Sequence, residues 1–147
     1  MNIAVGADHG GFELKEHVMS WLKDHGYEVE DCGTYDGEVS VDYPEFGRNV
    51  SKKVTSGECE LGVLICGTGI GISIAANKVR GIRCSLCHDT FSAKMARQHN
   101  DANVLAMGAR VIGRGLALEI LEAWLSRSFE GGRHQRRVDQ IGDIERD

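Results

Sequence analysis

A cysteine at the start of a glycine-rich turn is the feature of this sequence whose residue types could do chemistry. Cys66 follows the apolar run 61–65 and precedes the turn 67–71, and residues 72–78 are expected to form a helix. Apolar runs without polar alternation are typical of parallel strands that are covered on both faces. The unpaired amides at a helix start favour an anion and the thiolate form of a nearby cysteine. The pattern therefore predicts a thiolate beside backbone N–H groups that can hold negative charge.

Two interpretations of Cys66 stay open on its residue type alone, because an unpaired cysteine is often only a small buried hydrophobic residue. Five cysteines, an odd number, in a chain without an apparent export signal indicate free thiols and no disulfide framework.

The turn 67–71 fits neither the dinucleotide fingerprint nor a nucleoside-triphosphate loop. A cysteine phosphatase would need an arginine where Ile72 stands. Residues 84–88 match the spacing of a haem-attachment motif, but they overlap an expected core strand.

Composition narrows the class of protein. The chain has 147 residues, 41% of them hydrophobic and 27% charged, and a net charge of −5. These values are typical of a globular domain and argue against nucleic acid as a partner. No apolar run is long enough to span a bilayer, and no basic segment followed by an apolar one opens the chain. A cytoplasmic protein without a membrane partner is therefore expected.

Strand and helix patterns alternate along the chain. Strands are expected at residues 2–7, 27–30, 61–66, 82–86 and 104–107, and helices at 12–25, 45–55, 72–78, 90–98 and 115–128. This alternation predicts an α/β protein with a three-layer, Rossmann-like fold. Its five-stranded parallel sheet is expected in the flavodoxin-like order 2-1-3-4-5, with helices on both faces. Residues 1–147 are expected to form a single domain that ends in a helical arm at about 131–147.

The expected sheet brings distant polar residues to one edge. Parallel sheets bind ligands outside the carboxyl ends of the strands, where the strand order reverses. Asp8 and His9 then lie on one lip of a crevice, with Cys66 and its turn on the other. Arg133 and Arg137 are four residues apart, so on a helix they could hold one phosphate together. A solvated basic face is the alternative for these arginines, as a surface or capping role is for His9 and His99.

The chain resembles the type B ribose-5-phosphate isomerases, a family that also includes the lactose-pathway galactose-6-phosphate isomerases. The resemblance covers essentially the whole chain. It is carried by five blocks in register: GADHGGF at 6–12, DYP at 42–44, ICGTGIGISIAANK at 65–78, RQHND at 97–101 and EGGRHQRR at 130–137.

The resemblance implies an aldose–ketose isomerase that interconverts ribose 5-phosphate and ribulose 5-phosphate through an enediolate, without metal or organic cofactor. It implies that Cys66 is the base, that His99 assists ring opening and that Thr68 assists catalysis. The implied substrate-binding residues are Asp8, His9, Gly67, Thr68, Gly69, Ile70, Gly71, Asn100, Arg110, Arg133 and Arg137. Of these, the amides of 67–71 and Asn100 would hold the oxyanion, and the three arginines would bind the phosphate.

The position of His99 and Asn100 predicts an oligomer. Both precede the strand expected at 104–107, so they should lie at the amino end of the sheet, away from the crevice. They reach a crevice most easily from a second subunit, so we expect a homodimer, or a dimer of dimers, with the site at the interface. Two alternatives in function stay open: an isomerase of a six-carbon sugar 6-phosphate of allose or galactose type, and a non-catalytic sugar-phosphate-binding or redox module.

Overall fold

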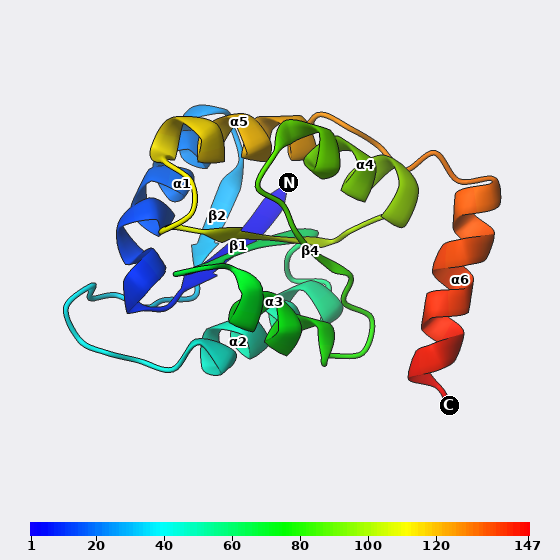
Figure 1. Ribbon diagram of the computed structural model, residues 1–147, viewed down its shortest axis with the longest axis horizontal. Helices are drawn as coiled ribbons and strands as arrows, with labels where there is room; N and C mark the ends of the chain where they lie inside the picture. Colours follow the sequence, from blue (N-terminus) through cyan, green and yellow to red (C-terminus); the bar gives the residue numbers. More distant parts are fainter.

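A single parallel sheet forms the centre of the protein, as a computed structural model of residues 1–147 shows (Figure 1). Its strands are β1 (Asn2–Ala7), β2 (Glu28–Asp31), β3 (Leu61–Cys66), β4 (Cys84–Leu86) and β5 (Val104–Gly108). A short 3-10 turn, η1 (His9–Gly11), follows β1. The helices are α1 (Phe12–Asp24), α2 (Tyr43–Thr55), α3 (Ile70–Asn77), α4 (Thr90–Asn100), α5 (Arg114–Leu125) and α6 (Arg133–Glu145).

Helices cover both faces of the sheet. Helices α1, α4 and α5 lie on one face, α2 and α3 on the other, and α6 stands at one end of the molecule (Figure 1). The larger hydrophobic cluster lies under the first group and contains Trp124 and Leu105. The smaller one lies under α2 and α3 and contains Phe46, Ile72 and Cys66. The predicted α/β class and three-layer arrangement are confirmed.

The order of the last two strands differs from the prediction. The sheet runs β2-β1-β3-β5-β4, whereas 2-1-3-4-5 was expected. All five residues of β5 are buried, while β4 has three residues, none of them buried. The strand buried throughout takes the inner position, and the short exposed strand forms the edge. Consequently β3 pairs with β5, and Cys66 lies opposite Gly108.

Helix α4 continues further than its sequence pattern predicts. His99 and Asn100, expected in a polar turn, form its last residues, and Asp101 ends the helix in a left-handed conformation (φ 47°). The guanidinium of Arg83 donates to the carbonyl oxygens of Asn100 (3.1 Å) and Asp101 (2.9 Å). These carbonyls at the helix end gain a cationic partner from outside the helix. Strand β4 correspondingly begins at Cys84, and residues 82 and 83 lie outside it.

Helix α6 packs against α4 through its first half. Its buried residues are His134 and Val138, whereas Ile141 and Ile144 are exposed. Near its end the Glu145 carboxylate accepts hydrogen bonds from the Gly81 amide, 3.1 Å away. None of the helices has the length and apolar composition needed to cross a membrane.

Candidate active site

The turn after β1 lies directly on the end of β3. The Asp8 amide donates to the Ile65 carbonyl oxygen (3.3 Å), and the Asp8 carboxylate accepts from the Gly11 amide (3.1 Å). A Cβ atom on Gly11 would lie 2.5 Å from the Ile65 carbonyl oxygen, so only glycine allows this approach. Asp8 is buried, and its carboxylate caps the start of η1. The first predicted lip of the crevice is therefore held against the strand that ends in Cys66.

Cys66 lies under the first turn of α3. Its side chain is 4% exposed, and its sulfur accepts a hydrogen bond from the Gly69 amide at 3.1 Å. Gly69 precedes α3 with a φ of 77°, and a Cβ there would lie 2.6 Å from Leu86 Cδ1. The Ile70 amide in turn donates to Thr68 Oγ1 (3.2 Å). An N–H donor at a helix start stabilises negative charge on the sulfur.

Arg110 joins the same edge from the end of β5. Its amide donates to the Gly67 carbonyl oxygen at 2.9 Å. A Cβ on Gly10 would lie 3.6 Å from the Gly67 amide nitrogen and 3.8 Å from Arg110 Nη2, so these residues border one space. The structure thus brings together most residues of the predicted crevice: Asp8, His9, Cys66, Gly67, Thr68, Gly69, Ile70, Gly71 and Arg110.

Two further residues lie at this edge, and the sequence patterns assign no function to either of them. The Tyr43 ring lies over Gly71, since a Cβ there would be 2.5 Å from Tyr43 Cζ. His88 follows β4, and its Nε2 accepts from the Gly108 amide at 3.0 Å. The strand-end rule that selects Asp8 and Cys66 also applies to His88 and could have found it. Tyr43 begins α2, so no such rule selects it.

A hydrogen bond also fixes His9. Its Nδ1 accepts from the Val41 amide at 3.1 Å, which ties the end of the 32–42 loop to the crevice. With Nδ1 as acceptor, the neutral ring carries its proton on Nε2. His9 is half-buried and can present that N–H to a ligand.

Four predicted site residues lie elsewhere in the chain: His99, Asn100, Arg133 and Arg137. His99 and Asn100 end α4, before the start of β5, whereas Cys66 lies opposite its last residue. A five-residue parallel strand is about 13 Å long, so α4 ends far from the crevice. Arg133 and Arg137 are exposed on α6, at the end of the molecule (Figure 1), and neither forms an ion pair.

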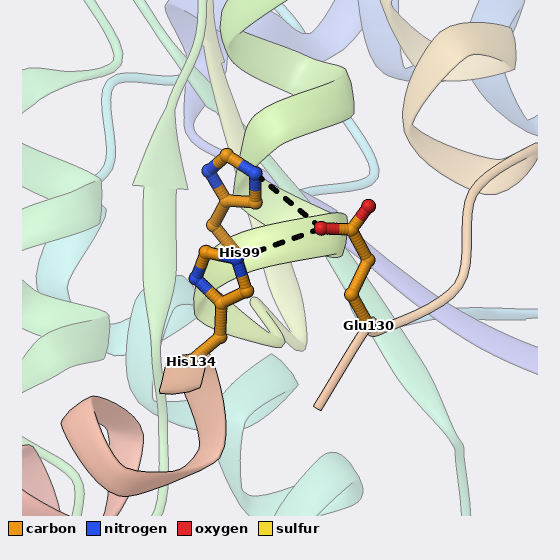
Figure 2. A group of neighbouring side chains, drawn as sticks. All are labelled: His99, Glu130 and His134. Atoms are coloured by element: carbon orange, nitrogen blue, oxygen red, sulfur yellow. Dashed lines mark ion pairs between the residues drawn. The ribbon is translucent and has the colours of Figure 1, made fainter. Parts of the chain in front are cut away.

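His99 belongs to a cluster with His134 and Glu130 (Figure 2). The two imidazole rings stack with their centroids 4.1 Å apart and their planes 8° apart. The Glu130 Oε1 atom lies 3.6 Å from His99 Nε2 and 3.5 Å from His134 Nε2. Burial, together with the neighbouring His99 ring and the Arg133 guanidinium, lowers the pKa of His134 below its usual value.

The other thiols differ from Cys66 in their surroundings. All five cysteines are free. Burial raises the pKa of Cys32, Cys59 and Cys87 to about 11 and that of Cys84 to about 12. These four thiols are therefore protonated at neutral pH, and none of them accepts a hydrogen bond from an amide at a helix start.

The fold and the position of Cys66 define a class of protein: an α/β protein whose central parallel strand ends in a thiol, at the edge where parallel sheets commonly bind ligands. The sequence profile described as ribose/galactose isomerase matches residues 3–141. The chain belongs to this family of isomerases.

Individual relatives agree over nearly their full length. The chain is 52% identical over 143 residues to ribose-5-phosphate isomerase B of Escherichia coli, covering 97% of this chain and 95% of that protein. It is 46% identical over 147 residues to D-erythrulose-4-phosphate isomerase of Pectobacterium atrosepticum, covering 99% and 95%. Ribose-5-phosphate isomerase B of Clostridium thermocellum superposes with a TM-score of 0.98 at 56% identity, covering 99% of this chain and 98% of that one. The ribose 5-phosphate isomerase of Thermotoga maritima superposes with a TM-score of 0.94 at 49% identity, covering 97% of each chain.

Proposed function

We propose that this protein interconverts ribose 5-phosphate and ribulose 5-phosphate. The observation that carries the proposal is the position of Cys66, whose sulfur accepts a hydrogen bond from the Gly69 amide at the edge of the sheet where Asp8 and Arg110 also lie. Isomerisation of an aldose to a ketose needs a base next to the carbonyl and donors for the oxyanion that forms. Near-full-length similarity to a ribose-5-phosphate isomerase B supports the choice of substrate.

In the proposed mechanism Cys66 is the base. Its thiolate takes the proton from carbon 2 of the open-chain sugar and returns it to carbon 1, while the hydroxyl proton on oxygen 2 moves to oxygen 1, so that an enediolate forms and collapses. The Gly69 N–H stabilises the thiolate before the proton moves. Amides of the 67–71 turn, with Asn100, hold the negative charge of the enediolate, and the Thr68 hydroxyl assists. No metal or organic cofactor takes part.

The remaining residues bind and open the sugar. Asp8 and His9 contact its hydroxyl groups, and the Nε2 proton of His9 is the donor because its Nδ1 is already engaged. Arg110, Arg133 and Arg137 bind the phosphate, since guanidinium groups match its geometry. His99 opens the furanose ring by proton transfer.

The site is proposed to be shared between two subunits. Four of the proposed residues lie away from Cys66 of their own chain, and a second copy supplies them: His99, Asn100, Arg133 and Arg137. Exposed apolar side chains lie on α3, β4 and the start of α4, as a subunit contact would require: Ile70, Ile74, Leu86 and Phe91. A two-fold axis that pairs these surfaces makes two identical sites, in a homodimer or a dimer of dimers.

Substrate length is the part of the proposal most open to test. The four-carbon substrate in the name of the Pectobacterium relative indicates that one scaffold serves sugars of different length. An assay should compare ribose 5-phosphate with allose 6-phosphate, galactose 6-phosphate and a four-carbon sugar phosphate. Preference for ribose 5-phosphate, abolished by Cys66→Ala, is the expected result. Preference for a six-carbon substrate would replace the assignment, and binding without turnover of any sugar would indicate a non-catalytic module.

A further inference from the structure

The corner between α4 and α6 places three potential metal ligands together (Figure 2). His99, Glu130 and His134 each offer one ligand atom, and these three atoms all lie within 4.8 Å of one another. His134 is only 6% exposed, yet its Nε2 atom has no hydrogen-bond partner. A buried ring nitrogen without a partner is costly and rare in native proteins. The Nε2 atom of His134 therefore needs a hydrogen-bond or metal partner.

The distances within the cluster match a bound ion better than direct hydrogen bonds. Glu130 Oε1 lies 3.5 Å from His134 Nε2 and 3.6 Å from His99 Nε2. Hydrogen bonds between nitrogen and oxygen are usually about 2.7–3.2 Å long. Ligands of a tetrahedral Zn²⁺, each about 2.0–2.2 Å from the metal, are about 3.3–3.6 Å from one another. The carboxylate already has nearly that spacing to both rings.

The imidazole rings of His99 and His134 must change their relative orientation before both can bind one ion. They are nearly parallel, so their in-plane lone pairs do not yet converge on one point. The side chains of His99 and Glu130 are 38% and 48% exposed, which leaves them free to turn toward the fixed, buried His134. Ligation also requires each ring to carry its proton on Nδ1, the tautomer that leaves Nε2 as donor to a metal.

We propose that His99, Glu130 and His134 form a binding site for Zn²⁺. Two imidazole nitrogens and one carboxylate oxygen are a ligand set that zinc accepts, with a fourth position open to water. Mg²⁺ and Ca²⁺ prefer sites made of oxygen ligands and are expected to bind weakly here. The site lies away from Cys66 of its own chain.

Zinc at this site inhibits turnover. The binding itself does not rest on the proposed function, but this consequence does, because it assumes that His99 opens the sugar ring. A metal on His99 Nε2 removes the nitrogen that would transfer the proton. Inhibition should be reversed by a chelator and should be weaker on an open-chain substrate.

The binding test is a calorimetric titration of the full-length protein with Zn²⁺, repeated with Co²⁺ by absorption spectroscopy. One ion per chain is expected at the cluster. Glu130→Gln should weaken that binding by at least about tenfold, because loss of even an outer-shell partner commonly costs 10- to 100-fold. Glu130 is exposed, so the variant tests the site even if the buried His134→Asn variant misfolds. His25→Gln, which removes the histidine that follows α1, is the matched control and should bind zinc as the wild type does.

The outcomes separate the two proposals. Zinc affinity that Glu130→Gln leaves unchanged would overturn the site, and a Co²⁺ spectrum dominated by a thiolate charge-transfer band would overturn it by assigning the ion to cysteine. Binding weakened by Glu130→Gln supports the site whatever happens to activity. If zinc then fills the site without slowing turnover, the site stands and the ring-opening role of His99 fails.

Discussion

The two regions that carry polar chemistry in this protein are built in opposite ways. Around Cys66 the backbone packs so closely that a Cβ on Gly11 or Gly69 would collide with neighbouring atoms. At the corner of α4 and α6, by contrast, Arg133 and Glu130 are exposed and His99 is half-buried. The first region offers a thiol and backbone amides, whereas the second offers imidazoles and arginines without a thiol. Each has what the other lacks, which is the pattern expected of two halves of one site contributed by different subunits.

The largest expected effect is at the first region. Cys66→Ala should lower kcat by about 10²- to 10⁴-fold, the usual contribution of a general base. The fold should persist, because alanine fits the buried end of β3. Steady-state kinetics and a thermal melt measure both effects. Cys59→Ala, which alters the buried cysteine just before the other end of the strand, is the control and should keep its activity. Turnover by Cys66→Ala close to that of the control would remove Cys66 as the base.

Alkylation compares the five thiols directly. Because burial raises the pKa of Cys32 and Cys59 to about 11, their thiolate is scarce at neutral pH. Their reaction with iodoacetamide should accelerate about tenfold per pH unit, or about 100-fold from pH 7 to 9. At pH 7 we expect Cys66 to react first, with loss of activity and protection by ribose 5-phosphate. Mass spectrometry of digested protein identifies the site, and modification confined to the other cysteines contradicts this expectation.

The second region is tested through its arginines. Arg137→Ala should raise KM with little change in kcat, because the phosphate is remote from the reacting carbons. A hydrogen bond to a charged group contributes about 1.5–3 kcal/mol, which corresponds to about 10- to 150-fold in KM. Arg136→Ala, one position earlier on the same exposed helix, is the matched control and should leave KM unchanged. Equal effects of the two substitutions would indicate a general basic surface with no specific phosphate site.

The smallest expected effect concerns the packing of the first region. Gly69 and Gly57 both have positive φ values, 77° and 85°, but no atom lies within 4 Å of a Cβ on Gly57. Alanine at either position meets backbone strain, while only Gly69→Ala also meets Leu86 and Met107. Gly69→Ala should therefore lower the free energy of unfolding by about 1–3 kcal/mol more than Gly57→Ala does. Urea unfolding measures the difference, and equal losses would show that the turn is not closely packed.

Sequence patterns were sufficient for the fold class and for one region of the site. Runs such as 61–65 are apolar throughout because both faces are covered, and the strand-end rule then brings Asp8 and Cys66 together. Such patterns do not predict the order of the strands, since the pairing of β5 with β3 depends on the relative burial of β4 and β5. That pairing, in turn, puts Arg110 beside Gly67.

The corner of α4 and α6 is harder to predict from the sequence. The sequence offers no local sign that His99 would stack on His134, because the contact depends on how α6 packs against α4. Local patterns do not predict the end of α4, because its capping partner, Arg83, lies outside the helix. They do not predict the contact of Tyr43 with Gly71 either, because it depends on how α2 packs against α3. Local patterns thus identify elements and their ends, while tertiary contacts decide which side chains meet.

Mixing two inactive variants tests the shared site most directly. Cys66→Ala and His99→Asn should each be nearly inactive on ribose 5-phosphate as separate proteins. When the two chains are co-expressed, about half of the dimers are mixed and each mixed dimer holds one intact site, so about a quarter of wild-type activity should return. No recovery from a mixture shown to contain mixed dimers would mean that Cys66 and His99 do not act across a subunit interface.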